Sequence, residues 1–464
     1  MSPTRFKRGI RWLLAGGIVF VLTFLILIGP WPNYEGSLEE VHYLEESLEE
    51  IDRQASTKES QSERTGFLAG WGSQSIAPPI GMPLAGYGAR QGGPSTGIRD
   101  DVFVKALAVG DGVDTAIIIG SDLLIVPENV ADQVRSQISK TTNLSGNEIL
   151  FTASHNHSGP GGFAPGIVSG LFNGPYHPAM VDLLVSAFVG AIVESIETME
   201  PASVMGGGVD VPELIKNRER ADAPVDSELS YLHIEKASGD QCIVVSYSAH
   251  PTIIRSDSFK ITGGYPGFLM RQLTVLTGAE VIYLGGAVGS MGHRAPEAPT
   301  SFERSELMGK ALAERVAKEL EHDQGKEAEM DVEVIGAPLK LPPYQFRLNR
   351  NLRLSKFLLP ILGVDSDGWL QGVRIGGIVL IGTPADYSGE ISVQLKSKAA
   401  KKGIDLWVLS FNGDYVGYIS PDAYYNELEP DGSLGYERGT MSWIGPQQEA
   451  YTTTLIERLI EKLF

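Results

Sequence analysis

Apolar runs alternate with amphipathic stretches from about residue 66 to the end of the chain. Short apolar runs predict β-strands at residues 115–126, 148–153, 242–248, 280–284, 375–381 and 405–411. Stretches with helical spacing predict α-helices near residues 127–140, 178–197, 265–277, 303–322, 387–402 and 447–463. Strands that alternate with helices are typical of a layered α/β fold. We therefore expect a single large α/β domain over residues 66–464.

One apolar run near the N-terminus, from Trp12 to Ile28, is different in character. With Gly29 it approaches the roughly 20 residues that cross a bilayer. We expect an uncleaved transmembrane anchor over residues 1–33, because the run is long for a signal peptide and no small-x-small cleavage site follows it. A cleaved signal peptide is the alternative. Basic residues at positions 5, 7, 8 and 11 predict a cytoplasmic N-terminus, a single pass, and an extracytoplasmic domain.

The segment between the anchor and the domain, residues 34–65, is rich in Glu, Ser, Gln and Lys. Its apolar positions indicate a short acidic helix. We expect this segment to form a stalk.

Charge and cysteine content narrow the range of functions. The formal net charge is −19, and the body of the chain has no basic block of the kind that binds phosphates, which argues against nucleic acid as a partner. Cys242 is the single cysteine, so no disulfide framework or thiolate metal cluster is possible within the chain. Because Cys242 lies in an apolar run, we expect it to be a small buried hydrophobe.

Predicted strands end in residues that can bind a metal ion. Residues 148–153 lead into His155 and His157, 242–248 lead into His250, and 375–381 lead into Asp386. In α/β folds, function gathers in the loops that follow the carboxyl ends of strands. A catalytic zinc takes about three N or O ligands and keeps one open position. The pattern permits a zinc site of two histidines and a carboxylate, and a structural role for the histidines is the alternative.

Several motifs occur in the same order as the landmarks of neutral ceramidases, which the chain resembles over roughly residues 70–450. They are Gly86-Tyr87, Gly97-Ile98-Arg99, Ser121-Asp122, His155-Asn-His157-Ser-Gly-Pro-Gly-Gly, Asn217-Arg218, Ala249-His250-Pro251-Thr252 and Tyr436-Glu437. The most specific is HNHSGPGG, which is close to the family's HTHSGPGG. The resemblance implies a zinc-dependent hydrolase of the amide bond in ceramide-like N-acyl sphingoid lipids. We expect the catalytic domain to stand alone, without the immunoglobulin-like domain that ends many members.

The resemblance also implies roles for individual residues. The implied zinc ligands are His155, His250, Asp386 and Tyr418, with Glu390 as a substitute carboxylate. The implied catalytic or substrate-facing residues are His157, Arg218, Tyr425 and Tyr436. The family has Glu where this chain has Asp386, but the shorter side chain still supplies an oxygen ligand. Without the resemblance, each tyrosine would be interpreted as a core aromatic residue.

The chain departs from the family at a Gly-Asp-x-Ser-Pro-Asn segment whose serine is the family's nucleophile. Here Ser290 falls where the family has Asp, and Gly292 falls where it has Ser. Two mechanisms remain open: Ser290 attacks from a shifted loop, or a zinc-bound hydroxide attacks directly. We prefer the second, because it requires only the metal. The neighbouring His293 is either an added proton donor or an exposed loop residue.

The sequence is therefore consistent with three functions. The leading one is zinc-dependent hydrolysis of a ceramide-like lipid at the membrane. A zinc hydrolase of another N-acyl or ester lipid is the second. The third is a non-catalytic surface protein that keeps the fold and uses it for binding. The sequence leaves the oligomeric state open.

Overall fold

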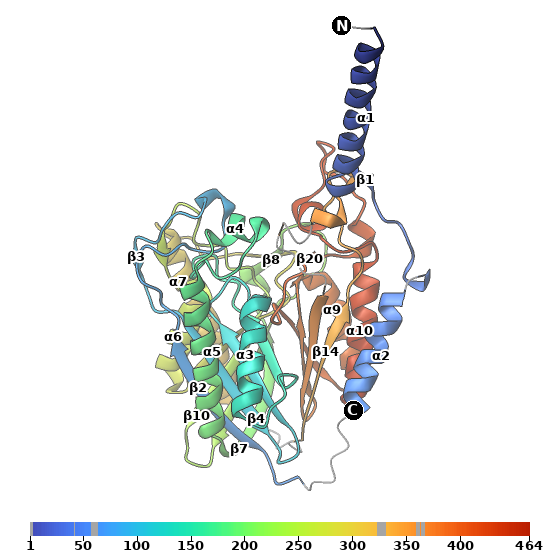
Figure 1. Cartoon of the computed structure of the whole chain (residues 1–464). Coiled ribbons are helices and arrows are strands. Elements are labelled where there is room, and N and C mark those ends of the chain that lie inside the picture. The colour runs from blue at the N-terminus through green and yellow to red at the C-terminus, as the bar shows by residue number, and fades with distance from the viewer. Residues whose placement is uncertain (1–2, 41, 57–63, 323–330, 359–361, 363–366) are drawn as a thin grey trace.

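The computed structural model describes residues 3–40, 42–56, 64–322, 331–358, 362 and 367–464, which contain two large β-sheets and four two-stranded ones (Figure 1). The eight-stranded sheet has the order β12 (Glu280–Gly285), β10 (Gln241–Tyr247), β9 (Glu228–Lys236), β7 (Glu200–Asp210), β2 (Leu68–Ser75), β4 (Phe103–Gly110), β5 (Thr115–Ser121) and β6 (Ile149–Ala153). The four-stranded sheet has the order β14 (Val332–Lys340), β16 (Asp367–Ile375), β17 (Ile378–Thr383) and β19 (Asp405–Ser410). The short parallel pair β18 (Asp386–Tyr387) and β20 (Tyr418–Ile419) lies beyond the end of β17.

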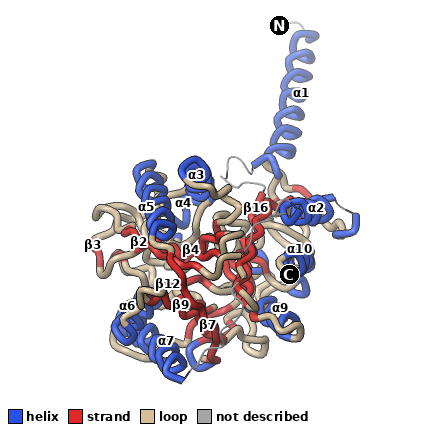
Figure 2. Tube along the Cα trace, turned by 90° about the horizontal axis from the view of Figure 1, so that it is seen from below, coloured by secondary structure: helices blue, strands red, loops and turns tan. Residues whose placement is uncertain are grey.

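Helices cover the outer faces of the two sheets (Figures 1 and 2). Against the eight-stranded sheet lie α3 (Glu128–Thr141), α5 (Pro178–Glu197), α6 (Gly264–Thr277) and α7 (Ser301–His322). Against the four-stranded sheet lie α2 (His42–Ser56), α9 (Gly389–Ala400) and α10 (Gln448–Lys462). The architecture is therefore mixed helix and sheet in four layers, which agrees with the expected layered fold.

The two sheets face each other across a shared apolar core. In β5, Ile117 and Ile119 pack toward the helices, whereas Ile118 packs into the cluster that joins the sheets. From the other sheet, Val373 and Leu380 are fully buried in that same cluster. Because successive side chains of a strand point to opposite faces, a strand between two apolar layers must be apolar throughout. This explains the continuous apolar runs that the sequence shows.

The predicted helices begin and end within two residues of their observed bounds, and four predicted strands match β6, β10, β12 and β19 to within one residue, but the other two need correction. The run at 375–381 is two antiparallel strands: β16 ends at Ile375, β17 begins at Ile378, and Gly376 with φ 56° lies in the turn. The run at 115–126 is shorter than predicted, because β5 ends at Ser121. Strands such as β7, whose alternate residues are exposed, carry no continuous apolar run and were not predicted.

The acidic helix that was expected in a stalk is α2, and it packs against the domain. Ile51 is fully buried among residues of the four-stranded sheet and α10. The hydroxyl of Ser47 lies 3.1 Å from that of Tyr451, and Asp52 accepts hydrogen bonds from Arg458. At least residues 42–56 therefore belong to the folded body, and residues 57–63 lie outside the described part of the chain.

Helix α1 (Pro3–Leu27) projects away from the domain (Figure 1). Its apolar stretch Arg11–Leu27 is exposed along its length. Among the described helices, α5 is the one long and apolar enough to cross a bilayer, and Arg11–Leu27 is shorter; but half of the apolar window of α5 is buried, and Phe188 and Ile192 are fully buried in the core. We therefore interpret α5 as a core helix. Cys242 is fully buried, as expected, and burial raises the pKa of its thiol.

Candidate functional site

Loops from both sheets meet at one end of the molecule and bring the predicted metal ligands together. β6 leads into His155 and His157, and β10 leads into His250. From the four-stranded sheet, β17 leads into β18, where Asp386 is the direct ladder partner of Tyr418 in β20. Residues far apart in the sequence thus converge beyond the strand ends, where ligands bind in open α/β sheets.

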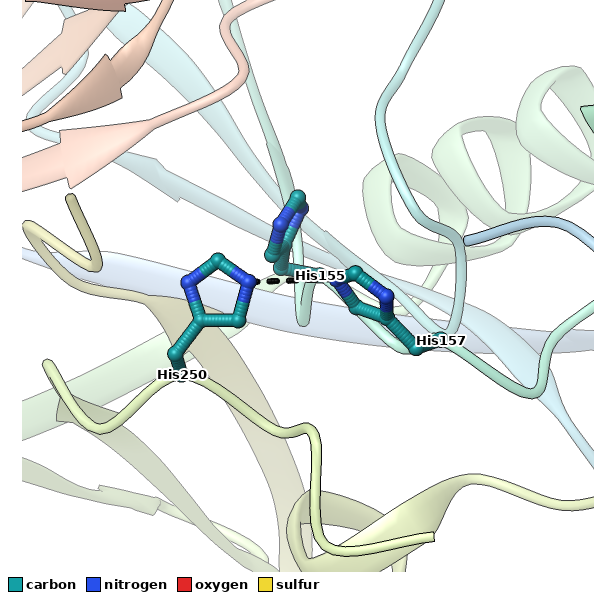
Figure 3. Close-up of side chains that lie close together, drawn as sticks. All are labelled: His155, His157 and His250. Atoms are coloured by element: carbon teal, nitrogen blue, oxygen red, sulfur yellow. Dashed lines mark hydrogen bonds between the residues drawn. The ribbon is translucent and has the colours of Figure 1, made fainter. Parts of the chain in front are cut away.

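The three histidines lie close together (Figure 3). The ring centroid of His155 is 4.7 Å from that of His157 and 4.4 Å from that of His250. Each ring offers a nitrogen that lies within 4.8 Å of the other two, and the Nε2 atoms of His157 and His250 are 3.1 Å apart. Two ligand atoms on one tetrahedral zinc ion lie about 3.4 Å apart. The three imidazoles are therefore close enough to share one ion.

Backbone carbonyls determine which nitrogen of His155 and of His250 faces the centre. The Nδ1 of His155 donates to the carbonyl oxygen of Leu124 at 2.7 Å, and the Nδ1 of His250 donates to that of Val288 at 3.3 Å. A neutral imidazole that donates through Nδ1 carries its lone pair on Nε2. Both Nε2 atoms are therefore oriented as ligands, and a backbone carbonyl is a common partner for the other nitrogen of a metal-binding histidine.

Asp386 faces His155 from the opposite sheet. Its Oδ1 lies 3.3 Å from the Nε2 of His155, and neither atom has a hydrogen-bond partner among the described residues. Its Oδ2 accepts a hydrogen bond from the hydroxyl of Tyr415 at 2.6 Å. Two buried acceptors that face each other are unfavourable unless a proton or cation lies between them. A metal ion bound by both His155 and Asp386 would satisfy this pair.

Burial sets the protonation of these groups. It lowers the pKa of His155 to about 3, and it lowers the pKa values of His157 and His250 well below the ordinary value. The imidazoles are therefore neutral near pH 7, which is the form that binds a metal. Burial also raises the pKa of Asp386 to about 7, against the lowering effect of the Tyr415 hydrogen bond. A nearby cation would favour the ionised carboxylate.

The histidine loop is held by the Gly86-Tyr87 motif and the residues that follow it. Gly86 has φ 112°, and a Cβ there would lie 2.6 Å from the Cα of His157, so only glycine fits. The ring of Tyr87 lies 4.8 Å from that of His157. The buried Arg90 donates to the carbonyl oxygen of His157 at 2.6 Å. His155 has a left-handed backbone with φ 56°, which is uncommon for a residue other than glycine and often marks a functional site.

A cavity of about 300 Å³ opens beside the ligands. The ligand end of its wall includes His155, His157, Asp386, Tyr418 and Tyr436, and acidic residues at other points of the wall are Glu128, Asp367 and Asp414. Most of the remaining wall is apolar, with contributions from α4 (Ile167–Asn173), the loops beside it and the C-terminal segment: Leu124, Phe163, Val168, Phe172, Met441 and Trp443. The cavity can therefore hold an apolar chain with a polar group at the ligand end.

A buried charge network supports the polar end of the cavity. Arg218 donates through Nε to the carboxylate of Glu437 and through Nη2 to the hydroxyl of Tyr418 at 3.2 Å. Burial alone would lower the pKa of Arg218, but the adjacent Glu437 carboxylate holds it above its usual value. Arg218 therefore stays charged. It orients Tyr418 from behind, and it is not among the side chains that line the cavity.

Ser290 lies in a buried turn with φ 60°. Its backbone NH donates to Glu437 at 2.8 Å, and its hydroxyl is 3.0 Å from that of Ser388. Gly292 follows in β13 (Met291–His293), where a Cβ would lie 3.3 Å from the Cβ of Arg218. Neither Ser290 nor His293 is among the described residues that line the cavity. Burial lowers the pKa of His293 to about 4.

The two remaining tyrosines and Glu390 occupy different places. Tyr436 is 53% exposed and lines the cavity, so it can contact a substrate. Tyr425 is buried and accepts a hydrogen bond from Gln345, and the structure does not bring it to this cavity. Glu390 accepts from Asn217 at 2.8 Å and from Tyr424 at 2.9 Å, so both of its oxygens are already hydrogen-bonded.

Sequence reasoning gave no site role to Tyr415, Phe411 or Glu437. Tyr415 holds Asp386, and the ring of Phe411 stacks on His155 with centroids 4.5 Å apart and planes at 6°. Phe411 and Tyr415 follow β19, so their position after a predicted strand was the available signal. Glu437 adjoins Tyr436, but its contact with Arg218 joins residues far apart in the sequence and cannot be derived from either motif alone.

Comparison with known proteins supports the family at the level of sequence. Residues 67–269 match the family model described as neutral/alkaline non-lysosomal ceramidase, N-terminal. The chain is 23% identical over 203 residues to a neutral ceramidase of Mycobacterium tuberculosis, covering 40% of this chain and 32% of that protein. It is 24% identical over 177 residues to neutral ceramidase A of Dictyostelium discoideum, covering 34% and 25%. The aligned region thus spans about a third or less of these relatives.

Comparison with solved structures extends over more of the chain. The crystal structure of the neutral ceramidase from Pseudomonas aeruginosa superposes with a TM-score of 0.71 at 16% identity, covering 86% of this chain and 74% of that one. At this identity the likeness shows the fold. The family-model match includes the His155 and His250 motifs, so in sequence the N-terminal part of the domain is similar to neutral/alkaline non-lysosomal ceramidases, and the fold is similar over most of the chain.

Proposed function

We propose that this protein is a metal-dependent hydrolase that cleaves the amide bond of N-acyl sphingoid lipids such as ceramide. The observation that carries the proposal is the cavity of about 300 Å³, which joins a mostly apolar wall to a cluster of metal-ligating atoms. An acyl chain requires the apolar part, and amide hydrolysis requires the polar part. The family-model match over residues 67–269 and the names of the similar proteins support this choice of substrate class.

Zinc is the metal that best matches the donor atoms. His155, His250 and Asp386 would hold it, with Tyr418 beside the carboxylate and His157 within reach. Nitrogen and carboxylate ligands without thiolates are typical of catalytic zinc sites. The chemistry that a bound zinc ion supplies is polarisation of the amide carbonyl and a lowered pKa for water.

The chain's own residues supply positioning and proton transfer. His157 Nε2 faces the metal-ligand cluster, and burial keeps this imidazole neutral, so it can accept a proton from an attacking water and pass it to the leaving amine. The Tyr418 hydroxyl, held by Arg218, points toward the same polar end of the cavity. Tyr436 lies partly exposed in the wall, with its ring 5.9 Å from that of Tyr418. It can hydrogen-bond the substrate as it enters.

The nucleophile in this proposal is water, and Ser290 serves only to shape its loop. Its hydroxyl is buried against Ser388, and the family's serine position is occupied by Gly292. A serine nucleophile requires a base within hydrogen-bonding distance and access to the substrate carbonyl. The observed partner of the Ser290 hydroxyl is another hydroxyl, which is not a base.

We further propose that α1 anchors the protein in a membrane, with the domain on the extracytoplasmic side. The support is the exposed apolar stretch Arg11–Leu27 and the basic residues that precede it. A lipid substrate remains in the bilayer, so tethering the enzyme there keeps the cavity near its substrate.

The experiment is turnover of a fluorescent N-acyl sphingosine by the full-length protein in detergent micelles, with and without a metal chelator. We expect release of the fluorescent fatty acid, loss of activity with chelator, and recovery on addition of zinc. An N-acyl amino acid and an ester lipid are tested in parallel. Turnover of only one of these would reassign the substrate. A folded, zinc-loaded protein that cleaves none of them would contradict the proposal and favour a binding protein.

A further inference from the structure

A basic and apolar hairpin stands out in this acidic chain. Residues 346–358, called the basic hairpin below, read Phe-Arg-Leu-Asn-Arg-Asn-Leu-Arg-Leu-Ser-Lys-Phe-Leu and contain no acidic residue. The hairpin is closed by hydrogen bonds from the backbone NH of Leu348 to Leu352 O and of Leu354 to Phe346 O, at 2.7 and 2.9 Å. The chain as a whole carries a formal charge of −19, so a segment with only positive charge requires an explanation.

The basic hairpin is hydrogen-bonded to the segment that follows α1. The backbone NH and the hydroxyl of Ser355 donate to the carbonyl oxygens of Ile28 and Ile26, at 3.0 and 2.6 Å. Strand β1 (Trp31–Pro32) pairs with β15 (Leu352–Arg353), which forms one arm of the hairpin. The hairpin is therefore fixed at the point where the apolar helix enters the domain (Figure 1).

The exposed side chains of the basic hairpin have the chemistry of a membrane interface. Leu348 and Phe357 are 53% and 49% exposed. Arg350 and Lys356 are also exposed, and neither forms an ion pair with a described residue, although Glu35 lines the same hollow as Arg350. Aromatic and aliphatic side chains mixed with Lys and Arg are typical of segments that lie in the interface of a bilayer with anionic lipids.

The basic hairpin is also rigidly connected to the wall of the cavity. Phe346 packs against the cavity residue Trp443, with ring centroids 5.4 Å apart. The buried Arg347 donates to the backbone oxygens of Tyr425 and Arg438, which precede Trp443 in the chain. The position of the basic hairpin is therefore fixed relative to the segment around Trp443, which lines the cavity.

Helix α4 presents a second apolar edge beside the cavity. In α4, Val168 and Phe172 line the cavity, whereas Ile167 and Leu171 are each 58% exposed. α4 lies at the same end of the domain as the base of α1 (Figure 1). Exposed aliphatic residues around a cavity are expected where a protein meets an apolar partner.

We propose that the basic hairpin rests on an anionic lipid surface and, with α4, holds the cavity against the bilayer. Arg350 and Lys356 contact lipid headgroups, and Leu348 and Phe357 enter the interface. An N-acyl lipid then passes from the leaflet into the cavity without crossing water. The inference rests on the proposed anchor, and on the proposed lipid hydrolysis only for the identity of the lipid.

Site-directed spin labelling of the full-length protein in vesicles tests this contact. Cys242 is fully buried and its thiol pKa is raised, so a new exposed cysteine can be labelled selectively. We would label Leu348→Cys, and as a control Val275→Cys on α6, which is 78% exposed. In vesicles of phosphatidylcholine with phosphatidylglycerol, we expect the label at 348 to be relaxed by oxygen from the lipid and protected from an aqueous nickel chelate. The label at 275 should show the reverse.

Charge reversal separates the role of the basic residues from insertion of α1. We expect the double variant Arg350→Glu/Lys356→Glu to expose the label at 348 to the nickel chelate. It should also reduce turnover of vesicle-embedded N-acyl sphingosine by roughly tenfold or more, because about 1 kcal/mol is involved for each charge near an anionic surface. Turnover of a short-chain soluble analogue should not change. The matched control Lys401→Glu/Lys402→Glu, at exposed positions after α9, should behave as wild type.

The outcomes distinguish this inference from the proposed function. A label at 348 that stays aqueous in active wild-type protein overturns the inference alone. A lipid-buried label in a protein that cleaves no N-acyl lipid overturns the proposed function and leaves the contact standing. Protein that alkaline carbonate removes from the vesicles contradicts the anchor, and the inference falls with it.

Discussion

At the polar end of the cavity, two buried acceptor atoms face each other without a proton between them. His155 Nε2 and Asp386 Oδ1 are 3.3 Å apart and have no hydrogen-bond partner among the described residues, whereas the Nε2 atoms of His157 and His250, 3.1 Å apart, can share one hydrogen bond. Burying such groups is unfavourable unless something compensates. The surrounding contacts, from Tyr415, the Leu124 carbonyl and the Val288 carbonyl, hold the atoms in place for a cation.

A metal ion should therefore stabilise the folded protein as well as activate it. Binding that is specific to the folded state adds about 2.7 kcal/mol at a metal concentration of 100 times Kd. We expect zinc to raise the thermal unfolding midpoint of the chelator-treated wild type, measured by differential scanning fluorimetry. His155→Ala should lose this shift. His293→Ala, which changes a histidine outside the cavity, should keep it, and equal shifts in all three proteins would contradict the assigned ligands.

A second buried carboxyl, Asp122, should make stability depend on pH. Burial raises its pKa to about 7, partly opposed by the hydrogen bond that it accepts from the Phe103 backbone NH. Between its unfolded value near 3.8 and about 7, the folded state binds more protons, so rising pH destabilises it by up to about 1.4 kcal/mol per pH unit.

The test compares wild type with Asp122→Asn, which keeps the shape of the side chain but cannot ionise. Urea unfolding at pH 5, 6, 7 and 8 should show wild type losing stability relative to the variant up to about pH 7, and then a constant difference. A difference that is independent of pH over this range would show that Asp122 does not titrate as its burial requires.

Among individual residues, the sequence predicts the candidate site best where the residues belong to a recognisable motif. His155, His250 and Asp386 follow predicted strands, and the resemblance implies that they are metal ligands; the structure brings their side chains together. Glu437 could not be predicted, because its partners Arg218 and Ser290 come from loops that meet only in the folded molecule. Tyr425 was assigned from resemblance, yet its hydroxyl lies with Gln345 away from the cavity.

Among the elements, α2 has the composition of an exposed helix but packs against the domain. Its acidic, polar sequence is typical of an exposed helix, but Ile51 forms a narrow apolar contact with the four-stranded sheet and α10. The strand predicted at 375–381 begins three residues before β17 for a related reason. A tight turn at Gly376 joins two buried strands, and the apolar run continues through it. Periodicity alone cannot separate a long buried strand from a buried hairpin.

If α2 is an integral part of the domain, truncating its buried side chain should destabilise the whole domain. Ile51→Ala should lower the free energy of unfolding by about 2–5 kcal/mol, the usual range for a buried Ile→Ala change. Glu49→Ala, at an exposed position of the same helix, should change it by less than about 0.5 kcal/mol. Urea unfolding of both variants provides the measurement, and equal effects would support a detached stalk.

For the molecule as a whole, the two face-to-face sheets explain why the site is assembled from distant parts of the chain. Loops that follow strands of the eight-stranded sheet contribute the histidines, and the segments that follow β17 and β19 of the four-stranded sheet contribute Asp386 and Tyr418, which pair with each other in β18 and β20. The sequence could predict a layered α/β fold from its alternating runs. It could not predict that the strands divide into two sheets, because strand pairing between distant segments leaves no local pattern.

The proposed orientation in the membrane predicts sensitivity to protease from outside. Protease added to intact cells or spheroplasts should degrade the domain, because α1 places everything after it beyond the cytoplasm. An antibody against the C-terminal helix, with a cytoplasmic protein as the integrity control, follows the reaction on a blot. A domain that survives until the membrane is permeabilised would reverse the topology.

The central claim is that a metal held by His155, His250 and Asp386, and not a serine, cleaves the amide. The most direct measurement is the zinc content and the turnover of N-acyl sphingosine on the same purified samples of wild type, His155→Ala and Ser290→Ala. We predict about one zinc per chain in wild type and in Ser290→Ala, most of the activity retained in Ser290→Ala, and loss of both zinc and activity in His155→Ala. A folded Ser290→Ala protein that keeps its zinc but loses activity by several orders of magnitude would contradict the account, because that is the signature of a lost covalent nucleophile.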